Sequence, residues 1–326
     1  MPNRILLTTT SYQDTPGKHH DLLAGSGLDV VRARGPLQEA DMLKLLADGE
    51  GFDGLLNGDD LITSRVIDAA LATRRKLRVI AKYGIGLDSI DVKHATEKKL
   101  PVLFTPGVNH TTVAEHAIGL MIALVKHFWV HLKSTKSGGW KRVTGNELAG
   151  KTIGVIGMGR IGKEVITRAA AFDMKPVAFD LYWDGAFAWK HKVERAQTAE
   201  DVLAKADVIS LHMNLDDANR EFINTARIAK MKKGAIVINT ARGGLVNEAD
   251  VAEACRTGQM GGYGTDVLDH EPPAPNHPFA AVDNIIVTPH VGSRTFESVE
   301  RQALRATQNI VNFLSGGSDY IQANKF

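Results

Sequence analysis

Residues 152–162 read TIGVIGMGRIG, in which an apolar run is followed by glycines spaced as G-x-G-x-x-G. The run predicts a β-strand, and the pattern of residues 161–172 predicts a helix directly after it. An isolated G-x-G-x-x-G is a weak signal, but between a strand and a helix it is typical of a dinucleotide-binding turn. We expect Gly157 to permit the tight turn, Gly159 to let backbone amides approach a pyrophosphate, and Gly162 to allow close helix packing.

An acidic residue stands where ribose recognition needs one. Asp180 ends the next apolar run, 18 residues after the last glycine of the turn. Its carboxylate should accept hydrogen bonds from the adenosine ribose hydroxyls and repel a 2′-phosphate. The next three residues, Leu181, Tyr182 and Trp183, include no cation that could bind such a phosphate. The sequence therefore predicts NAD rather than NADP as the cofactor.

Short β-like runs alternate with helical patterns along the chain, which is typical of parallel βα units. We predict an α/β fold with two doubly wound parallel-sheet domains, a Rossmann NAD-binding domain inserted in a flavodoxin-like substrate-binding domain. The expected domains are residues 1–103 plus 294–326 for the substrate and residues 104–293 for NAD. The runs are residues 5–10, 28–34, 54–58, 77–84 and 101–105, and then 152–157, 175–180, 206–212, 235–240, 263–268 and 284–289.

The NAD-binding domain is expected to include a long linking helix near residues 111–136, with Thr111 or Thr112 as its N-cap. The apolar content of this helix exceeds what one face needs, so we expect partners beyond its own domain and predict a homodimer. Trp140 follows the helix, where it either closes a pocket across a dimer interface or packs locally.

Composition excludes several classes of protein. The net charge is +2 and the basic residues form no run of five or more, so no nucleic-acid partner is expected. The N-terminal residues lack the apolar core of a secretion signal, and no stretch is long and apolar enough for a membrane span, so we expect a cytoplasmic protein. The only cysteine, Cys255, is expected to be an inert thiol in a helix.

Three polar residues downstream of the glycine turn each stand in a distinctive phrase: Arg242 in NTARGGLVNE, Glu271 in DVLDHEPP and His290 in TPHVG. Reduction of a 2-keto acid needs a proton for the developing alkoxide and a clamp for the carboxylate. We predict that His290 donates the proton, that Glu271 stabilises its imidazolium, and that Arg242 holds the substrate carboxylate. Each residue alone has a structural explanation, and only the combination indicates catalysis.

A metal site is not expected. His127 and His131 are spaced i and i+4 on the predicted helix, but the sequence HFWVH lacks the glutamate that a zinc hydrolase places after its first histidine. We expect packing or interface roles for both.

Ordered motifs along the whole chain resemble the D-isomer-specific 2-hydroxyacid dehydrogenase family: KYGIGLDSID, TPGVNHTTVAEHAIGL, GMGRIG, ADVISLH, NTARGGLVNE, DVLDHEPP and TPHVGS. The resemblance implies that the backbone amides of Ile85 and Gly86 grip the substrate carboxylate, with Asn109 and Ser293 near the pocket. It also implies a set of cofactor contacts beyond the glycines and Asp180, namely Arg160, Ile161, His212, Thr240, Ala241, Asp266 and Gly292.

Departures from the family pattern narrow the expected substrate. Ile85 stands where phosphite-oxidising relatives have lysine, Glu271 where formate-oxidising relatives have glutamine, and Asn57 and Gly58 where many phosphoglycerate-oxidising relatives have arginine. Similarity of the HVGS phrase to glyoxylate and hydroxypyruvate reductases favours a small 2-keto acid. Two alternatives stay open: a 3-phosphoglycerate dehydrogenase-like enzyme, in which Lys82 or Arg65 would replace the arginine, and a non-catalytic NAD-sensing regulatory protein of the same fold.

Overall fold

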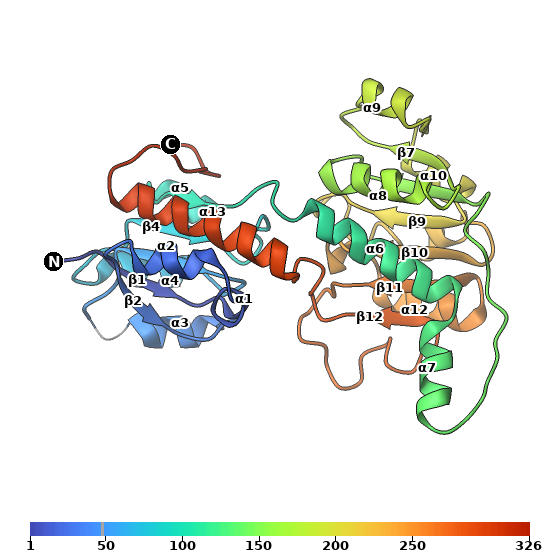
Figure 1. Ribbon diagram of the computed structural model, residues 1–326, viewed down its shortest axis with the longest axis horizontal. Coiled ribbons are helices and arrows are strands. Elements are labelled where there is room, and N and C mark those ends of the chain that lie inside the picture. The colour runs from blue at the N-terminus through green and yellow to red at the C-terminus, as the bar shows by residue number, and fades with distance from the viewer. Residues whose placement is uncertain (47–48) are drawn as a thin grey trace. The chain divides into compact units, whose positions relative to one another are not determined.

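The structure is a computed structural model that describes residues 1–46 and 49–326. The chain divides into two compact units: unit 1 comprises Met1–Asn109 and Arg294–Phe326, and unit 2 comprises His110–Ser293. Both units are parallel α/β sheets covered by helices on their two faces (Figure 1). The predicted fold class is therefore confirmed.

Unit 1 holds a parallel sheet in the order β2-β1-β3-β4-β5, which is the flavodoxin-like order with its switch point between β1 and β3. All of its strands except the edge strand β2 are largely buried on both faces, which explains why they read as continuous apolar runs. The strands are β1 (Arg4–Leu7), β2 (Asp29–Arg32), β3 (Gly54–Asn57), β4 (Val79–Lys82) and β5 (Val102–Leu103). The helices are α1 (Thr10–Asp14), α2 (Lys18–Ala24), α3 (Glu39–Leu46), α4 (Ser64–Ala72), α5 (Val92–Glu97) and α13 (Phe296–Leu314).

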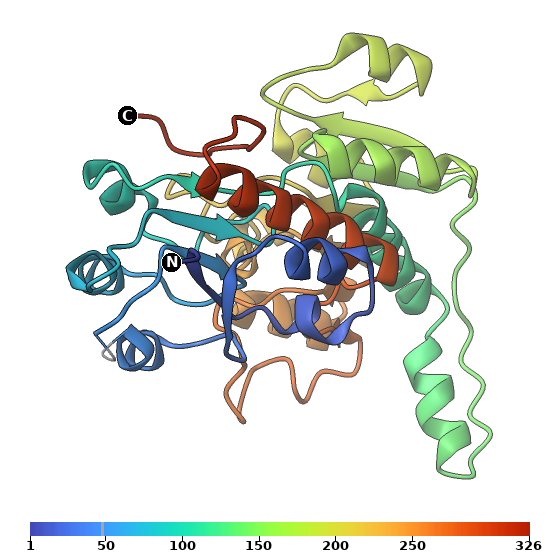
Figure 2. The same ribbon diagram turned by 60° about the vertical axis from the view of Figure 1, so that its left-hand side comes forward.

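The C-terminal helix α13 completes one face of unit 1. It begins after Thr295, whose side chain accepts a hydrogen bond from Ser298 N, and it packs beside α2 (Figures 1 and 2). Apolar side chains of α13, such as Ala303 and Ile310, are fully buried against β1, β3 and β4. Helices α3, α4 and α5 cover the opposite face.

Unit 2 holds a parallel sheet in the order β12-β11-β10-β9-β6-β7-β8, so the strand order reverses between β6 and β9. Its strands are β6 (Thr152–Ile156), β7 (Lys175–Phe179), β8 (Glu194–Arg195), β9 (Val208–Leu211), β10 (Ala235–Asn239), β11 (Met260–Thr265) and β12 (Ile285–Val287). Its helices are α6 (His110–Val125), α7 (Phe128–Lys136), α8 (Arg160–Ala170), α9 (Gly185–Lys190), α10 (Ala199–Lys205), α11 (Thr225–Ile228), the 3₁₀ turn η1 (Gly243–Leu245) and α12 (Glu248–Thr257). A ligand crevice is expected at the carboxyl ends of β6 and β9 because the strand order reverses there.

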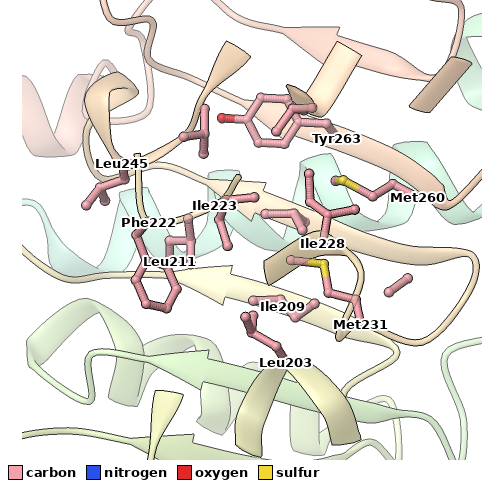
Figure 3. Packing of buried hydrophobic residues seen from close by; sticks show 14 of the residues in the cluster. Leu203, Ile209, Leu211, Phe222, Ile223, Ile228, Met231, Leu245, Met260 and Tyr263 are labelled. Atoms are coloured by element: carbon pink, nitrogen blue, oxygen red, sulfur yellow. The ribbon is translucent and has the colours of Figure 1, made fainter. Parts of the chain in front are cut away.

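Two apolar clusters hold the faces of this sheet. One lies under α6 and α8, and the other lies under α10, α11 and α12, where Leu203, Ile209, Phe222 and Tyr263 pack together (Figure 3). Cys255 belongs to the second cluster, and burial raises the pKa of its thiol to about 12. Cys255 lies buried in helix α12, and the raised pKa disfavours the reactive thiolate.

The first boundary between the units differs from the prediction. The chain leaves unit 1 at Asn109 rather than at residue 103. Thr105 N donates to Gly84 O at 2.9 Å, and Arg301 Nε donates to Val108 O at 3.1 Å. These bonds hold the intervening segment against unit 1, so the prediction ended the domain too early. The second boundary lies between Ser293 and Arg294.

The prediction of one continuous helix near residues 111–136 is wrong. The helical region begins at His110, before both proposed N-caps. It is two helices, α6 and α7, bent by 68° at a break where His127 has a φ of 51°. Asn146 N donates to Val125 O at 2.8 Å, which occupies a carbonyl that the helix would otherwise use. His127 therefore precedes α7 and His131 lies within it, so the two do not share a helix face.

Helix α7 and residues 137–144 extend away from the rest of unit 2 (Figures 1 and 2). No residue of α7 is buried, and Phe128, Leu132 and Trp140 are 48%, 56% and 81% exposed. Within the described residues no single helix is long and apolar enough to cross a membrane, and only the bent pair α6–α7, taken together, reaches the required length and composition.

Candidate active site

His290 and Glu271 meet on two loops of unit 2 that follow neighbouring strands. His290 follows β12 and Glu271 follows β11, and these strands pair in parallel, so both loops leave the same edge of the sheet. His290 Nδ1 lies 2.8 Å from Glu271 Oε2. Because a carboxylate only accepts, Nδ1 carries the proton of this bond, and Nε2 is the ring nitrogen on the opposite side.

The carboxylate of Glu271 is fixed at both oxygens. Oε1 accepts a hydrogen bond from Leu268 N at 2.9 Å, while Oε2 meets His290. The pair is about four-tenths exposed, with side chains 37% and 45% accessible for Glu271 and His290. A histidine oriented in this way can transfer a proton to or from a molecule bound beside it.

Arg242 is presented by the loop between β10 and η1. Asn239, which is fully buried at the end of β10, determines the shape of this loop: its Nδ2 donates to Arg242 O at 2.8 Å and its Oδ1 accepts from Ala241 N at 3.0 Å. Arg242 donates from one guanidinium nitrogen to Ala241 O at 2.7 Å. No role for Asn239 could be predicted from the sequence, although it opens the NTARGG phrase, because its contacts form only in the folded loop.

Asp266, at the end of β11, holds the backbone around His290. Its side chain accepts from Val291 N at 2.9 Å and Gly292 N at 2.7 Å, and its carbonyl accepts from His290 N at 2.9 Å. Burial would raise the pKa of this carboxyl, but the hydrogen bonds that it accepts outweigh burial and leave its pKa below the ordinary value. Asp266 therefore stays ionised within a largely buried site.

The glycine turn has the close contacts that its spacing predicts. A Cβ atom on Gly157, whose φ is 95°, would lie 2.6 Å from the carbonyl carbon of His212, and a Cβ on Gly162 would lie 2.1 Å from Gly157 O. By contrast, a Cβ on Gly159 would meet no heavy atom within 4 Å. Helix α8 begins at Arg160 without a side-chain cap, so no capping side chain occupies its first N–H groups, which can bind an anion.

Asp180 lies beside this turn at the end of β7. Its Oδ2 accepts from Met158 N at 2.5 Å and its Oδ1 accepts from Tyr182 N at 2.6 Å. These bonds fix the carboxylate next to the glycine loop, and each oxygen retains a second lone pair with which it can accept from a ribose hydroxyl.

Two other expected cofactor residues carry buried polar atoms that lack a partner within the part of the chain that the structure describes. These atoms are Thr240 Oγ1, after β10, and His212 Nδ1, after β9. His212 Nε2 meets Ser210 Oγ at 2.8 Å, and burial lowers the pKa of the ring to about 4, so His212 is neutral near pH 7. Orphaned polar atoms at the strand ends fit a site that a polar ligand completes.

The structure brings together in unit 2 the three catalytic candidates and the expected cofactor residues. Ile161 lies in the first turn of α8, and Ala241 and Gly292 lie on the loops described above. The expected substrate residues are divided: Ser293 ends unit 2, whereas Ile85, Gly86 and Asn109 belong to unit 1. Ile85 is 42% exposed on the loop after β4.

The chain is similar in sequence to a family of known dehydrogenases. A family model described as the NAD binding domain of D-isomer specific 2-hydroxyacid dehydrogenases matches residues 118–292. The chain is 38% identical over 283 residues to a hydroxypyruvate reductase of Thermotoga maritima, and the alignment covers 84% of this chain and 88% of that protein. It is 36% identical over 293 residues to a D-3-phosphoglycerate dehydrogenase of Methanocaldococcus jannaschii, which covers 88% of this chain but only 56% of that protein.

A solved crystal structure of a Thermus thermophilus protein has the same fold, with a TM-score of 0.88 at 35% sequence identity over 98% of this chain and 100% of that one. The family match lies on the unit that carries the glycine turn and is defined by NAD binding. The cofactor is NAD, as the sequence predicted.

Proposed function

Because the chain belongs to the D-isomer specific 2-hydroxyacid dehydrogenase family, we propose that it interconverts a small 2-keto acid and its D-2-hydroxy acid with NAD. The observation that carries this proposal is the 2.8 Å pairing of His290 Nδ1 with Glu271 Oε2. A proton donor oriented by a carboxylate is what an alkoxide formed from a keto acid requires. The sequence predicted an NAD-dependent enzyme of this family.

In the reductive direction His290 donates a proton from Nε2 to the carbonyl oxygen of the substrate. Glu271 stabilises the imidazolium before the transfer and keeps the ring oriented after it. Since Leu268 N holds the other carboxylate oxygen, the pair is oriented before substrate binds. In the oxidative direction the same nitrogen takes the proton from the hydroxyl group.

Arg242 holds the substrate carboxylate and polarises the carbonyl. A guanidinium presents five N–H donors in one plane, which suits a planar carboxylate. Support comes from the loop that carries it, since buried Asn239 hydrogen-bonds the backbone on both sides of the turn. The proposal also includes the backbone amides of Ile85 and Gly86, together with Asn109 and Ser293, as substrate-binding groups.

Several residues of unit 2 would hold the cofactor. The pyrophosphate would lie at Gly157, Gly159 and Gly162 and at the first amides of α8, from Arg160 and Ile161, and the ribose would lie at Asp180. The other proposed contacts are His212, Thr240, Ala241, Asp266 and Gly292. When bound, NADH supplies the hydride to the carbonyl carbon.

A small substrate is favoured over a phosphorylated one by the contacts of Lys82. Its side chain is 2% exposed, and the ammonium group donates to Gly58 O at 2.5 Å and to Asp59 Oδ1 at 2.6 Å. A cation already held by a carboxylate and a carbonyl attracts a phosphate less strongly than an uncompensated one. Oxidation of 3-phosphoglycerate is the second candidate, since a dehydrogenase named for that substrate shares 36% identity with the chain.

The experiment is NADH oxidation with glyoxylate, hydroxypyruvate, pyruvate, bulkier 2-keto acids and 3-phosphohydroxypyruvate, with a His290→Ala control. We expect the smallest keto acids to turn over fastest and the control to lose activity by roughly a hundredfold or more. Preference for 3-phosphohydroxypyruvate would overturn the small-acid assignment. Binding of NADH without turnover of any acid would favour a regulatory protein that senses NAD.

We further propose a cytoplasmic homodimer. The support for self-association is the exposed apolar surface of α7 and the segment after it, which includes Phe128, Leu132 and Trp140. Trp140 would lie in the interface with the second copy. A single cysteine in the sequence agrees with a reducing compartment, and cell fractionation tests the location.

A further inference from the structure

A chain of hydrogen bonds links helix α6 to the loop of His290. His116 Nε2, on α6, lies 2.8 Å from Thr288 Oγ1, and Thr288 Oγ1 lies 2.6 Å from Asp266 Oδ1. Because the ionised carboxylate only accepts, the threonine hydroxyl donates to Asp266 and accepts from His116. Nε2 of His116 therefore carries a proton, and the three side chains run in one direction from donor to carboxylate.

Asp266 is also the residue that holds the backbone of His290 and its neighbours. His290 has a φ of 51°, a left-handed conformation that is uncommon for a residue with a side chain. The bonds from His290 N, Val291 N and Gly292 N to Asp266 support this conformation. The Asp266 carbonyl binds His290 N, while the side chain binds the next two amides, so a shift of the side chain would release the backbone directly after His290.

Asp266 is closely packed by Gly292 and His116. A Cβ atom on Gly292 would lie 2.8 Å from Asp266 Oδ2 and 3.6 Å from the ring of His116. Asp266 is 3% exposed, and His116 Nε2 also lies 3.4 Å from its Oδ1. His116 thus supports the carboxylate directly and through Thr288.

We propose that His116 is a positioning residue for the reaction: through Thr288 and Asp266 it fixes the left-handed backbone of His290 and so sets the ring against Glu271. This inference rests on the proposed function of His290 as proton donor. His116 touches neither reacting group in this scheme, and its contribution is the geometry of the 288–292 loop.

The test compares substitutions that keep or remove the donor. His116→Phe keeps a ring of similar shape but loses the N–H, whereas His116→Gln keeps an N–H near the same place. We expect His116→Phe to lower kcat by roughly tenfold to a hundredfold, with KM changed less than about threefold, because misplacement of a catalytic group costs mainly rate. His116→Gln should restore most of kcat.

Two further variants distinguish the effect of this chain of hydrogen bonds from a general effect on packing. Thr288→Val removes the hydroxyl without changing the shape, and adding it to His116→Phe should cause little additional loss, since residues acting in one chain are not additive. His94→Phe removes the matched histidine–carboxylate pair, His94 Nε2 to Asp68 Oδ1 at 2.9 Å, in unit 1, and should leave kcat unchanged. Fully additive losses, or wild-type kcat in His116→Phe, would overturn the proposal.

A measurement on the resting protein, without turnover, tests the positioning role of His116 separately from the proposed function. The imidazole nitrogen resonances of His290, assigned with His290→Gln, report its bond to Glu271 in the resting protein. We expect them to shift in His116→Phe and to return toward wild type in His116→Gln. If the wild type reduces no 2-keto acid, the proposed function fails, and unchanged His290 resonances in His116→Phe would separately overturn the positioning role.

Discussion

A Cβ atom on Gly243 would lie 1.9 Å from the carbonyl carbon of Leu268 and 2.2 Å from Asp269 N. The loop that carries Arg242 therefore lies directly against the backbone of the loop that carries Glu271. Leu268 N also donates to Glu271 Oε1 at 2.9 Å. Contact between the two backbones therefore fixes the position of the Arg242 loop relative to the Glu271 loop.

The substitution Gly243→Ala should change the position of the Arg242 loop relative to the Glu271 loop. A methyl group has no space at the contact, so one loop must move away from the other. We expect a loss of about 1–3 kcal/mol in the free energy of unfolding, as for other overpacked sites, and a fall of roughly tenfold or more in kcat. Urea denaturation and steady-state kinetics measure the two effects.

Gly119→Ala is the matched control for that variant. Gly119 lies on the exposed side of α6, and an added Cβ would meet no heavy atom within 4 Å. In an exposed helix interior, alanine is favoured over glycine by about 1 kcal/mol. Equal losses in the two glycine variants would show that the contact with Leu268 has no special effect.

Glu271→Gln should slow the chemical step. The glutamine side chain can still accept a hydrogen bond from Leu268 N, but it no longer stabilises the imidazolium of His290 by charge. We expect kcat to fall by roughly a hundredfold with a much smaller change in KM. Combined with His290→Ala, the substitution should add little further loss, and additive losses would argue against a joint role.

The sheets could be predicted from the sequence because parallel strands buried on both faces read as continuous apolar runs. β6 and β10 each consist almost wholly of buried apolar residues. β8 could not be predicted, since it is the exposed pair Glu194–Arg195 and is a strand only through its pairing with β7. Its pattern carries no apolar signal.

The break between α6 and α7 was missed for a related reason. No glycine or proline marks it, and His127 adopts a left-handed conformation that its residue type does not announce. Val125 O is bound by Asn146 N, a contact with a later segment that no local pattern encodes. In the site, local phrases indicated Arg242 and His290, whereas the supporting roles of Asn239 and His116 appear only in contacts between distant segments.

Cofactor choice should depend on the charge of Asp180. Its carboxylate is fixed by Met158 N at 2.5 Å and Tyr182 N at 2.6 Å beside the glycine turn. Asp180→Asn removes the charge that would repel a 2′-phosphate. We expect the ratio of kcat/KM for NADPH to that for NADH to rise by roughly tenfold, equivalent to about 1.4 kcal/mol.

Asp184→Asn is the control for cofactor choice. Asp184 pairs with Lys163 at 2.5 Å and caps α9, so it shares the charge of Asp180 but has another partner. Its substitution should leave the cofactor ratio near the wild-type value. A similar rise in both variants would mean that the net charge of the region, rather than the position of Asp180, decides the preference.

Asp266 should make stability depend on pH. Burial opposes its ionisation, but the hydrogen bonds from His116, Thr288, Val291 and Gly292 hold its folded-state pKa below the ordinary value of 3.8. A lowered pKa adds stability that is fully present above the unfolded-state pKa and is lost as the pH falls through the folded-state pKa. We therefore expect Asp266→Asn to be less stable than wild type by about 1–3 kcal/mol near neutral pH, with the gap closing in acid.

Urea unfolding of the two proteins at neutral and increasingly acidic pH measures this gap. The difference in the free energy of unfolding should be constant above the ordinary carboxyl range and should shrink only below about pH 4. Asp266→Glu keeps the charge but changes the length, so its stability should retain the acid dependence. A gap that persists unchanged into acid would assign the loss to packing instead.

Self-association should depend on the apolar side of α7. Phe128 and Leu132 are one turn apart and lie on the same face, and both are substantially exposed. Leu132→Glu places a charge on that face, so we expect light scattering to change from twice the chain mass of 35.3 kDa to one chain mass. Lys133→Glu, on the neighbouring residue, should stay dimeric. Because no residue of α7 is buried in its own chain, circular dichroism should show both variants folded, and a dimeric Leu132→Glu protein would exclude this surface as the interface.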